Sequence, residues 1–368
     1  MHVLFRLHEP MLFRGPMEFS PFIRGPKTVA RSLTLPTPST IAGALATLCL
    51  DVQKSRHLQV AGWEEEVVEV LSLDGTLRGP YLIVEGDGEE IYVQFTDYLV
   101  KLGELVRTLR SLDQDLRSAL IAKKKKLKGL LEENYVNFYQ PILSERVGIR
   151  LEGEYKRVME RGGLYTVQMV DYSKLLSSKE EIVVDRTVDN ISVAVDVYGR
   201  SKISDLERRD YIVRFGGEGR LSHLIIKDGE PMMSKVNESL SDFERGEAYL
   251  YLITYSLYES SKEYAKIHEV CRGGYIASAI WERLKETLGK ISSSIELRYV
   301  IGECGIFGAG YSVSVEARKP MYAALTPGTI IKVEGTKEDL FNLYRKGVSE
   351  VGSKIGYGTV IPIPMSRF

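Results

Sequence analysis

The sequence predicts an α+β protein made of two tandem domains. Its 368 residues correspond to about two domains of ordinary size. Hydrophobic residues make up 44% of the chain and charged residues 27%, close to the average for folded globular proteins. In the second half, stretches with strand and helix periodicity follow one another in an order that is typical of a known α+β arrangement.

The second half has the order strand, helix, strand, strand, helix, strand. Thr336 and Asp339 have the spacing of a capping box, which supports the start of the second helix. The order βαββαβ is that of the ferredoxin-like split βαβ fold. The predicted strands are 248–258, 295–301, the pair 311–317 and 329–333, and 359–363, one strand more than the simple order contains, and the predicted helices are 262–288 and 337–348.

The first half is compatible with an expanded version of the same plan. A strand at 2–7 precedes a long loop, and Thr37 and Pro38 then mark the start of a helix that runs to Leu50. Further strands are expected at 67–73, 81–84 and 91–95 and at several places between 147 and 215. Leucines at spacings of three and four predict a long amphipathic helix from 102 into the lysine run 123–128.

The boundary between the domains is expected in a polar segment without periodicity, residues 227–246. We therefore assign 1–226 to an N-terminal ferredoxin-like domain with insertions and 247–368 to a C-terminal ferredoxin-like domain. Two tandem ferredoxin-like domains with insertions are the predicted architecture.

Composition excludes several classes of protein. The longest apolar stretches are shorter than the roughly 18 residues of a membrane span, and the first residues alternate like a strand, so we expect a cytoplasmic protein without a membrane partner. Three scattered cysteines (Cys49, Cys271 and Cys304) form neither a disulfide framework nor a zinc motif. We expect no metal and no cofactor.

Charge is segregated along the chain although the total is only −1. Residues 61–100 hold ten acidic side chains and one basic side chain, for a net charge of −9. Residues 1–60 hold seven basic and three acidic side chains, for a net charge of +4. Phosphate binding is therefore expected to be local, and the acidic 61–100 stretch is expected to face away from RNA.

No catalytic template is present in the sequence. The Walker loop, HExxH, GxSxG and paired CxxC motifs are all missing. Of the five histidines, only His223 adjoins a glycine-rich segment. We therefore expect that this protein is not an enzyme.

The N-terminal loop is the first candidate site. Arg14, Arg24, Lys27 and Arg31 are interleaved with Phe13, Phe19 and Phe22. Cations that hold phosphates, next to rings that hold splayed bases, suit single-stranded RNA. A protein-docking arm would have the same composition, and the two uses are compatible.

Two glycine-rich segments are further candidates. In the first, Gly216, Gly217 and Gly219 allow close backbone approach to an anion, and Arg220 and His223 add donors; the alternative is a tight turn with Glu218 and Arg220 paired. In the second, the backbone at Gly356 and Gly358 together with Lys354 would hold a phosphate and the Tyr357 ring would stack a base; the alternative is packing alone.

Several segments together resemble the Cas5-like RAMP subunit of type III-B CRISPR effector (Cmr) complexes. They are EPMLFRGPMEF at 9–19, ARSLTLPTPSTIAGALATL at 30–48, which contains Ser39, VGIRLEGEYKRVMERGGLYTVQMVDY at 147–172, FGGEGRLSHL at 215–224 and GYGTVIPIP at 356–364. The second glycine-rich segment is similar to the G-rich loop that marks RAMP proteins. The 61–100 stretch and the lysine run depart from the family pattern.

The resemblance implies two ferredoxin-like domains and a subunit without nuclease activity. It further implies binding of the 5′ handle of the guide (CRISPR) RNA, and docking on the large cyclase/polymerase-like subunit beside the backbone RAMP subunit. Two alternatives remain: a metal-independent endoribonuclease that processes precursor guide RNA with His223 as base, and a scaffold whose glycine loops only pack against neighbours.

Overall fold

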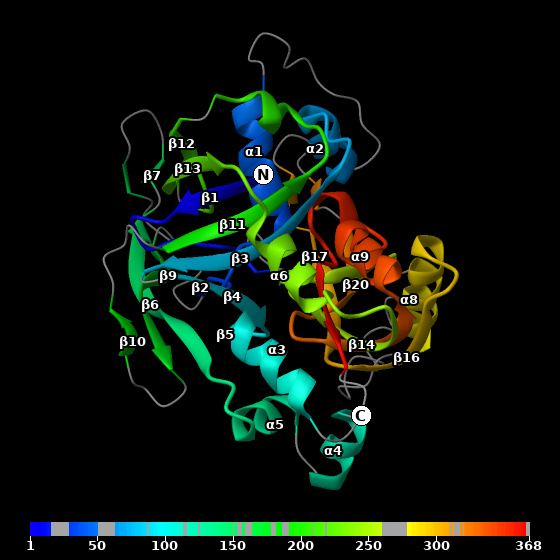
Figure 1. The fold of residues 1–368 in the computed structure, drawn as a ribbon. Helices are drawn as coiled ribbons and strands as arrows, with labels where there is room; N and C mark the ends of the chain where they lie inside the picture. Colours follow the sequence, from blue (N-terminus) through cyan, green and yellow to red (C-terminus); the bar gives the residue numbers. More distant parts are fainter. Residues whose placement is uncertain are drawn as a thin grey trace.

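The computed structural model describes most of the chain. The described residues are 1–15, 29–50, 63–86, 88–112, 116–123, 126–149, 151–152, 157–158, 164–177, 182–185, 191–207, 209–217, 219–259, 278–309, 311–312, 317–318 and 320–365. Antiparallel sheets dominate and helices lie on their faces, so the α+β class is confirmed (Figure 1).

The first half is built on one 11-stranded sheet with the order β10-β9-β6-β5-β4-β3-β11-β1-β13-β12, in which β2 also pairs with β9. All of its pairings are antiparallel except that of β2 with β9. Its strands are β1 (His2–Arg6), β2 (Val29–Arg31), β3 (Thr76–Glu85), β4 (Glu89–Phe95), β5 (Tyr98–Lys101), β6 (Phe138–Ile149), β9 (Leu164–Ser177), β10 (Ile182–Asp185), β11 (Ile191–Tyr198), β12 (Tyr211–Arg214) and β13 (Leu221–Lys227).

Within this sheet, β3, β11, β1 and β13 lie side by side in the split βαβ order of second, third, first and fourth strand. Helix α1 (Pro38–Cys49) connects the first strand to the second, as predicted. The connection from β11 to β13 holds a short 3₁₀ helix (Lys202–Asp205) and β12 in place of a second α-helix. The chain between β3 and β11 forms an insertion that widens the sheet.

The second half has the predicted order βαββαβ in its four-stranded sheet and helices, and residues 262–277 of its first predicted helix lie outside the described residues. Its four-stranded sheet has the order β16-β21-β14-β22, with β14 (Arg245–Leu252), β16 (Glu296–Ile301), β21 (Ile330–Thr336) and β22 (Val360–Pro364) all antiparallel to their neighbours. Helices α8 (Ser278–Ile291) and α9 (Lys337–Lys346) complete βαββαβ. The Thr336 hydroxyl accepts from the Asp339 amide and the Asp339 carboxylate accepts from the Thr336 amide, which confirms the capping box.

Three small sheets complete the strands of the described chain. They are β15 (Ser256–Tyr258), β20 (Met321–Leu325) and β17 (Cys304–Gly308); β18 (Tyr311–Ser312) with β19 (Ala317–Arg318); and β7 (Leu151–Glu152) with β8 (Arg157–Val158). The remaining helices are α2 (Trp63–Leu71), α3 (Leu102–Ser111), α4 (Leu116–Lys123), α5 (Leu127–Glu133), α6 (Pro231–Ser239) and the 3₁₀ helix Ser353–Ile355.

Five expectations about individual elements were wrong, and one of them is the single strand expected at 311–317, which contains residues of the two paired strands β18 and β19. Residues 67–73 belong largely to α2 rather than to a strand, the helix expected from 102 is divided into α3, α4 and α5, and 248–258 contains two strands of different sheets. The expected linker contains α6, whose Met232, Met233 and Val236 are buried. Because α6 packs against both β11 and β22, this segment joins the two halves rather than separating them (Figure 1).

The two halves share one hydrophobic core. Phe95 and Leu105 from the insertion, α6, and Tyr251 from β14 belong to the same buried cluster. The Tyr251 hydroxyl donates to the carbonyl of Gln94 at 2.8 Å. No helix in the described part of the chain is long and apolar enough to cross a membrane.

Candidate nucleic-acid interface

The N-terminal loop, the first glycine-rich turn and β13 meet at one end of the large sheet. Beyond β1, Met11 exchanges backbone hydrogen bonds of 2.8 Å with Val170 of β9. The Phe13 amide donates to the Ser32 hydroxyl at 2.9 Å, and the Leu33 amide donates to the Phe13 carbonyl at 2.7 Å. These contacts fix the N-terminal loop, residues 9–15, against β9 and the residues that follow β2.

The glycine-rich turn packs directly on this loop. Gly216 has φ +78°, and a Cβ there would lie 2.7 Å from the Leu12 carbonyl oxygen. The Gly217 amide donates to the same oxygen at 2.7 Å. That amide is therefore used inside the fold and does not face an anion, contrary to the phosphate-binding interpretation. Gly219, with φ +68°, faces open space.

Arg220 is held by an acidic partner. Its guanidinium forms an ion pair with Glu9, and a second nitrogen lies 3.5 Å from the Met169 sulfur. The side chain is only 16% exposed. Arg220 therefore ties the turn to the N-terminal loop. Glu218, the partner in the alternative interpretation, lies outside the described residues.

His223 lies on the exposed face of β13, where its neighbour is another histidine. In the register of the sheet it is opposite Arg6 of β1 and Ile212 of β12. The rings of His8 and His223 have centroids 4.5 Å apart at an interplanar angle of 67°. His8 was not among the predicted residues, because only the folding of the chain brings it beside His223.

The predicted cations of the loop are only partly described. Arg14 is exposed and forms an isolated β-bridge with Ser32. Arg31 lies in β2, with its backbone opposite Gln168. Arg24 and Lys27 lie outside the described residues, so their role stays a prediction.

The second glycine-rich segment lies at the junction of the two halves, away from the first turn. Tyr357 is fully buried, and its hydroxyl donates to the Ser39 hydroxyl at 3.0 Å. Its ring contacts Trp63 and Phe307 edge-on, at centroid distances of 6.0 and 5.4 Å. The expectation that this ring stacks on a base was therefore wrong, because no face of it reaches solvent.

The glycines of this segment serve close packing. A Cβ on Gly356 would lie 2.8 Å from the Gly79 carbonyl oxygen, and one on Gly358 would lie 2.3 Å from the Ser349 nitrogen. Lys354 alone among these residues is exposed, and Ser39 is half-buried at the start of α1. Burial raises the pKa of the nearby Glu64 carboxyl, with the Gly352 amide as a hydrogen-bond donor that opposes the shift.

Two buried ionisable side chains, Arg78 and Asp196, lie near the junction. Arg78 donates to the carbonyl oxygens of Tyr344 and Ser353, each at 2.7 Å, and burial lowers its pKa to about 10. Asp196 accepts from the hydroxyls of Tyr81 at 2.6 Å and Tyr198 at 2.9 Å, and burial raises the pKa of its carboxyl.

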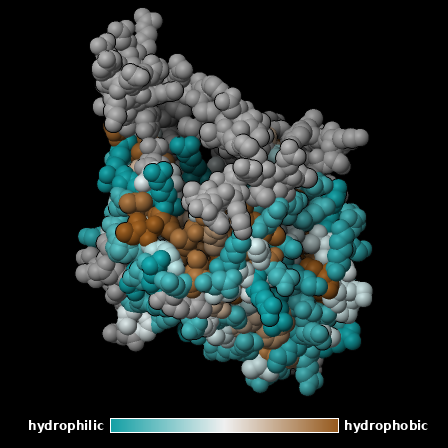
Figure 2. All heavy atoms as spheres, turned by 90° about the horizontal axis from the view of Figure 1, so that it is seen from above, coloured by the Kyte–Doolittle hydropathy of each residue, from teal (hydrophilic) through white to brown (hydrophobic). Residues whose placement is uncertain are grey.

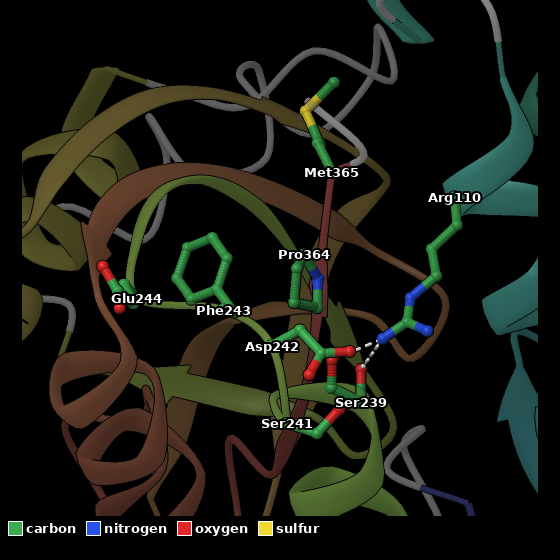
Figure 3. Close-up of a pocket in the computed structure, with 8 residues that line it drawn as sticks. All are labelled: Arg110, Ser239, Ser241, Asp242, Phe243, Glu244, Pro364 and Met365. Atoms are coloured by element: carbon green, nitrogen blue, oxygen red, sulfur yellow. Dashed lines mark hydrogen bonds between the residues drawn. The ribbon is translucent and has the colours of Figure 1, made fainter. Parts of the chain in front are cut away.

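A polar cavity of about 380 Å³ lies between α3 and the segment that joins α6 to β14 (Figure 3). Arg110 donates to the carbonyl and the hydroxyl of Ser239 there. The other lining residues are Ser241, Asp242, Phe243, Glu244, Pro364 and Met365. In the described part of the chain, no group of three or more His, Cys, Asp or Glu side chains is placed to hold a metal ion.

Comparison with known proteins agrees over nearly the whole chain. The chain is 24% identical over 366 residues to the CRISPR system CMR subunit Cmr3 of Saccharolobus solfataricus, covering 98% of this chain and 95% of that protein. Among solved structures, it is similar in fold to a chain of the cryo-EM structure of the type III-B Cmr-beta bound to cognate target RNA. That likeness has a TM-score of 0.52 and 21% identity, and covers 98% and 96% of the two chains. The same assembly with AMPPnP, in state 1, gives a TM-score of 0.54 at 20% identity with the same coverage.

The family model for the CRISPR-associated protein Cas_Cmr3 matches residues 9–135 and 116–365. This span contains α1, the first glycine-rich turn and the junction segment. The chain therefore belongs to the Cmr3 family of CRISPR-associated proteins.

Proposed function

We propose that this chain is the non-catalytic RNA-binding subunit of a type III-B CRISPR effector complex. It holds the 5′ handle of the guide RNA, and it docks on the large cyclase/polymerase-like subunit and the backbone RAMP subunit. Membership of the Cmr3 family supports a place in such a complex, and the likeness to a chain of an RNA-bound Cmr-beta assembly agrees with it.

The architecture in this proposal is two tandem ferredoxin-like domains. The strand order of second, third, first and fourth occurs in both sheets, around β1 and around β14, which supports that description. The insertion and the missing second helix of the first half are departures from the simple plan.

The observation that carries the RNA-binding proposal is the meeting of three segments at one end of the large sheet. Exposed Arg14 of the N-terminal loop meets there with exposed Gly219 and exposed His223, which come from a distant part of the sequence. Glu9, an acid in the same place, is neutralised by Arg220. A surface that offers cations and rings while its carboxylate is paired suits a phosphate chain with unpaired bases.

One observation favours the endoribonuclease alternative. Metal-independent RNA cleavage needs an acid and a base, and the 4.5 Å contact of His8 with His223 supplies two groups able to fill these roles. The rings touch each other, however, and leave no room between them for a scissile phosphate. We therefore keep the non-catalytic subunit as the proposed function.

Incubation of the purified full-length chain with end-labelled repeat RNA separates the alternatives. Retention of intact RNA is the expected result, and neither His8→Ala nor His223→Ala changes the length of the RNA. Cleavage that disappears in either variant would replace the proposal with the endoribonuclease. If the chain neither binds nor cleaves the RNA, the scaffold alternative is supported instead. Arg107→Ala, an exposed cation on α3, is the matched control for loss of charge.

A further inference from the structure

The exposed face of β12 and β13 presents a continuous row of side chains. In the antiparallel register, Ile212 lies opposite His223 and Arg214 lies opposite Leu221. Residues opposite each other in a sheet project from the same face, so these four side chains are neighbours. His8 extends the row through its contact with the His223 ring. We call these five residues the outer strip.

The outer strip is not part of the core. Ile212 is 68% exposed and Leu221 is 48% exposed, whereas Val213 and Leu224 on the opposite face are buried in the cluster that contains α1. Seen from above, hydrophobic residues reach the surface on the left of Figure 2, the side on which β12 and β13 lie in Figure 1. Two large apolar side chains exposed together on one sheet face form a small patch that another molecule can cover.

The charges beside the outer strip favour an anion. Arg214 is exposed at the edge of the sheet. Glu85, the neighbouring carboxylate, accepts from Lys227 at 2.9 Å and lies 3.5 Å from Arg6, so two cations surround one acid. Glu9, on the N-terminal loop, is paired with Arg220. Among the charged residues named here, four cations face two acids, which favours an anionic occupant over a basic protein.

The shape of the strip favours unpaired bases over a duplex. Rings and branched aliphatic side chains on a sheet face offer surfaces for the faces of single bases, and an adjacent arginine offers a phosphate contact. In a duplex the faces of the bases cover one another and only the backbone and the base edges in the grooves are presented, so the strip would have no base face to stack on. Single-stranded RNA uses every member of the strip.

We infer that the outer strip is a stacking platform for unpaired RNA bases, with His223 at its centre and His8 beside it. This rests on the proposed function, because the strip continues the surface of Arg14 and Gly219. It adds a new element: the bases lie on β12 and β13, at the open edge of the large sheet. The buried Tyr357 ring takes no part.

The test uses the full-length chain and a single-stranded RNA of roughly ten nucleotides, within the site sizes of single-strand binding folds. 2-Aminopurine replaces one base at a time, and its fluorescence reports stacking. Binding is expected to quench at least one position. His8→Ala/His223→Ala should remove that quenching and weaken binding about tenfold. His223→Tyr, which keeps a ring without an imidazole, should retain both, and a duplex of the same sequence should bind more weakly.

The outcomes separate this inference from the proposed function. If the wild-type chain binds RNA but the double variant keeps the affinity and the quenching, RNA lies elsewhere, and the stacking platform is refuted while the proposed function stands. If the wild-type chain binds no RNA, both the stacking platform and the proposed RNA-binding function are refuted. If Ile212→Asp leaves RNA binding unchanged and abolishes assembly with purified partner subunits, the strip is a protein-docking surface and the inference is overturned. Melting curves of each variant exclude unfolding as the cause.

Discussion

Arg78 of β3 donates a hydrogen bond of 2.7 Å from Nε to the carbonyl oxygen of Tyr344, in the last turn of α9. A residue of the first half thus places its positive charge at the negative end of a helix of the second half. The same guanidinium reaches the carbonyls of Arg345 and Ser353. One buried side chain therefore sets the position of α9 relative to the large sheet.

Replacement of Arg78 should destabilise the protein strongly. Arg78→Met keeps much of the volume but leaves several buried carbonyls without donors, so we expect a loss of about 3 kcal/mol in the free energy of unfolding. Urea denaturation measures it. Arg209→Met, at an exposed site, should leave the curve unchanged. Equal curves for the two variants would show that Arg78 does not hold the junction.

The buried carboxyl of Asp196 should make stability depend on pH. Burial raises its pKa in the folded state above the unfolded value of about 3.9, so the folded protein keeps a proton that the unfolded chain loses. Stability should therefore fall as pH rises from about 4 toward the raised pKa, by up to about 1.4 kcal/mol per unit.

Asp196→Asn removes this titration and keeps an oxygen to accept from Tyr81 and Tyr198. Urea unfolding between about pH 4 and about pH 7 should show a flatter profile for this variant than for the wild type. Asp205→Asn, at an exposed position, is the control and should keep the wild-type slope. Identical slopes in all three proteins would contradict the assignment.

Two glycines of the first turn form a matched pair. Gly216 and Gly219 have similar positive φ values, +78° and +68°, so alanine at either should cost roughly 1–2 kcal/mol of backbone strain. Only at Gly216 would the new Cβ also meet the Leu12 carbonyl, at 2.7 Å. Gly216→Ala should therefore lower the melting temperature more than Gly219→Ala. The reverse order would mean that the turn is not packed on the N-terminal loop.

Cations of the N-terminal loop should contribute to guide binding. A charge-assisted hydrogen bond to phosphate is worth about 1.5–3 kcal/mol, so Arg14→Ala or Arg31→Ala should weaken binding roughly ten- to hundredfold. Filter binding with handle RNA measures this, with Arg107→Ala as control. If both variants fold and bind like the wild type, the phosphate contacts lie in another part of the protein.

The acidic face of α2 should stay away from RNA. Glu65, Glu66 and Glu69 are exposed on this helix and would repel a phosphate backbone at close range. Photo-crosslinking of guide RNA carrying 4-thiouridine, followed by peptide mapping, should find no adduct within 63–71. Adducts there would place RNA on the acidic side of the molecule.

Local signals predicted the second half well. The capping box of Thr336 and Asp339 and the alternating strands around it act within a few residues, so the sequence shows them directly. Residues 67–73 were misjudged because their β-branched side chains suit a strand. Three glutamates in the preceding turn favour a helix start, and Val70 and Leu71 are buried on the helix that results.

Site residues were harder to predict because the sequence does not show what packs on them. Tyr357 lies between glycines, as an exposed ring in a loop would, yet α1 and α2 of the other half cover it. His8 and His223 are distant in sequence and meet only through the pairing of β1 with β13. Glu9 and Arg220 meet in the same way. Pairing between distant strands, and not residue type, decides these contacts.

The insertion of the first half begins at the end of β3 and ends at the start of β11. These two points are adjacent, because Val84 of β3 and Ile191 of β11 are direct partners in the sheet. The connection between β3 and β11 therefore has the geometry of a hairpin whose tip is enlarged. The inserted segment also contacts the second half. The Thr96 amide donates to the Pro327 carbonyl at 3.0 Å, and the Phe95 ring packs on Gly328. Deletion of the segment between Val84 and Ile191 would therefore keep the ends of β3 and β11 in register but would uncover Gly328 and the Pro327 carbonyl of the second half. The segment is easy to remove from the sheet but costly to remove from the junction.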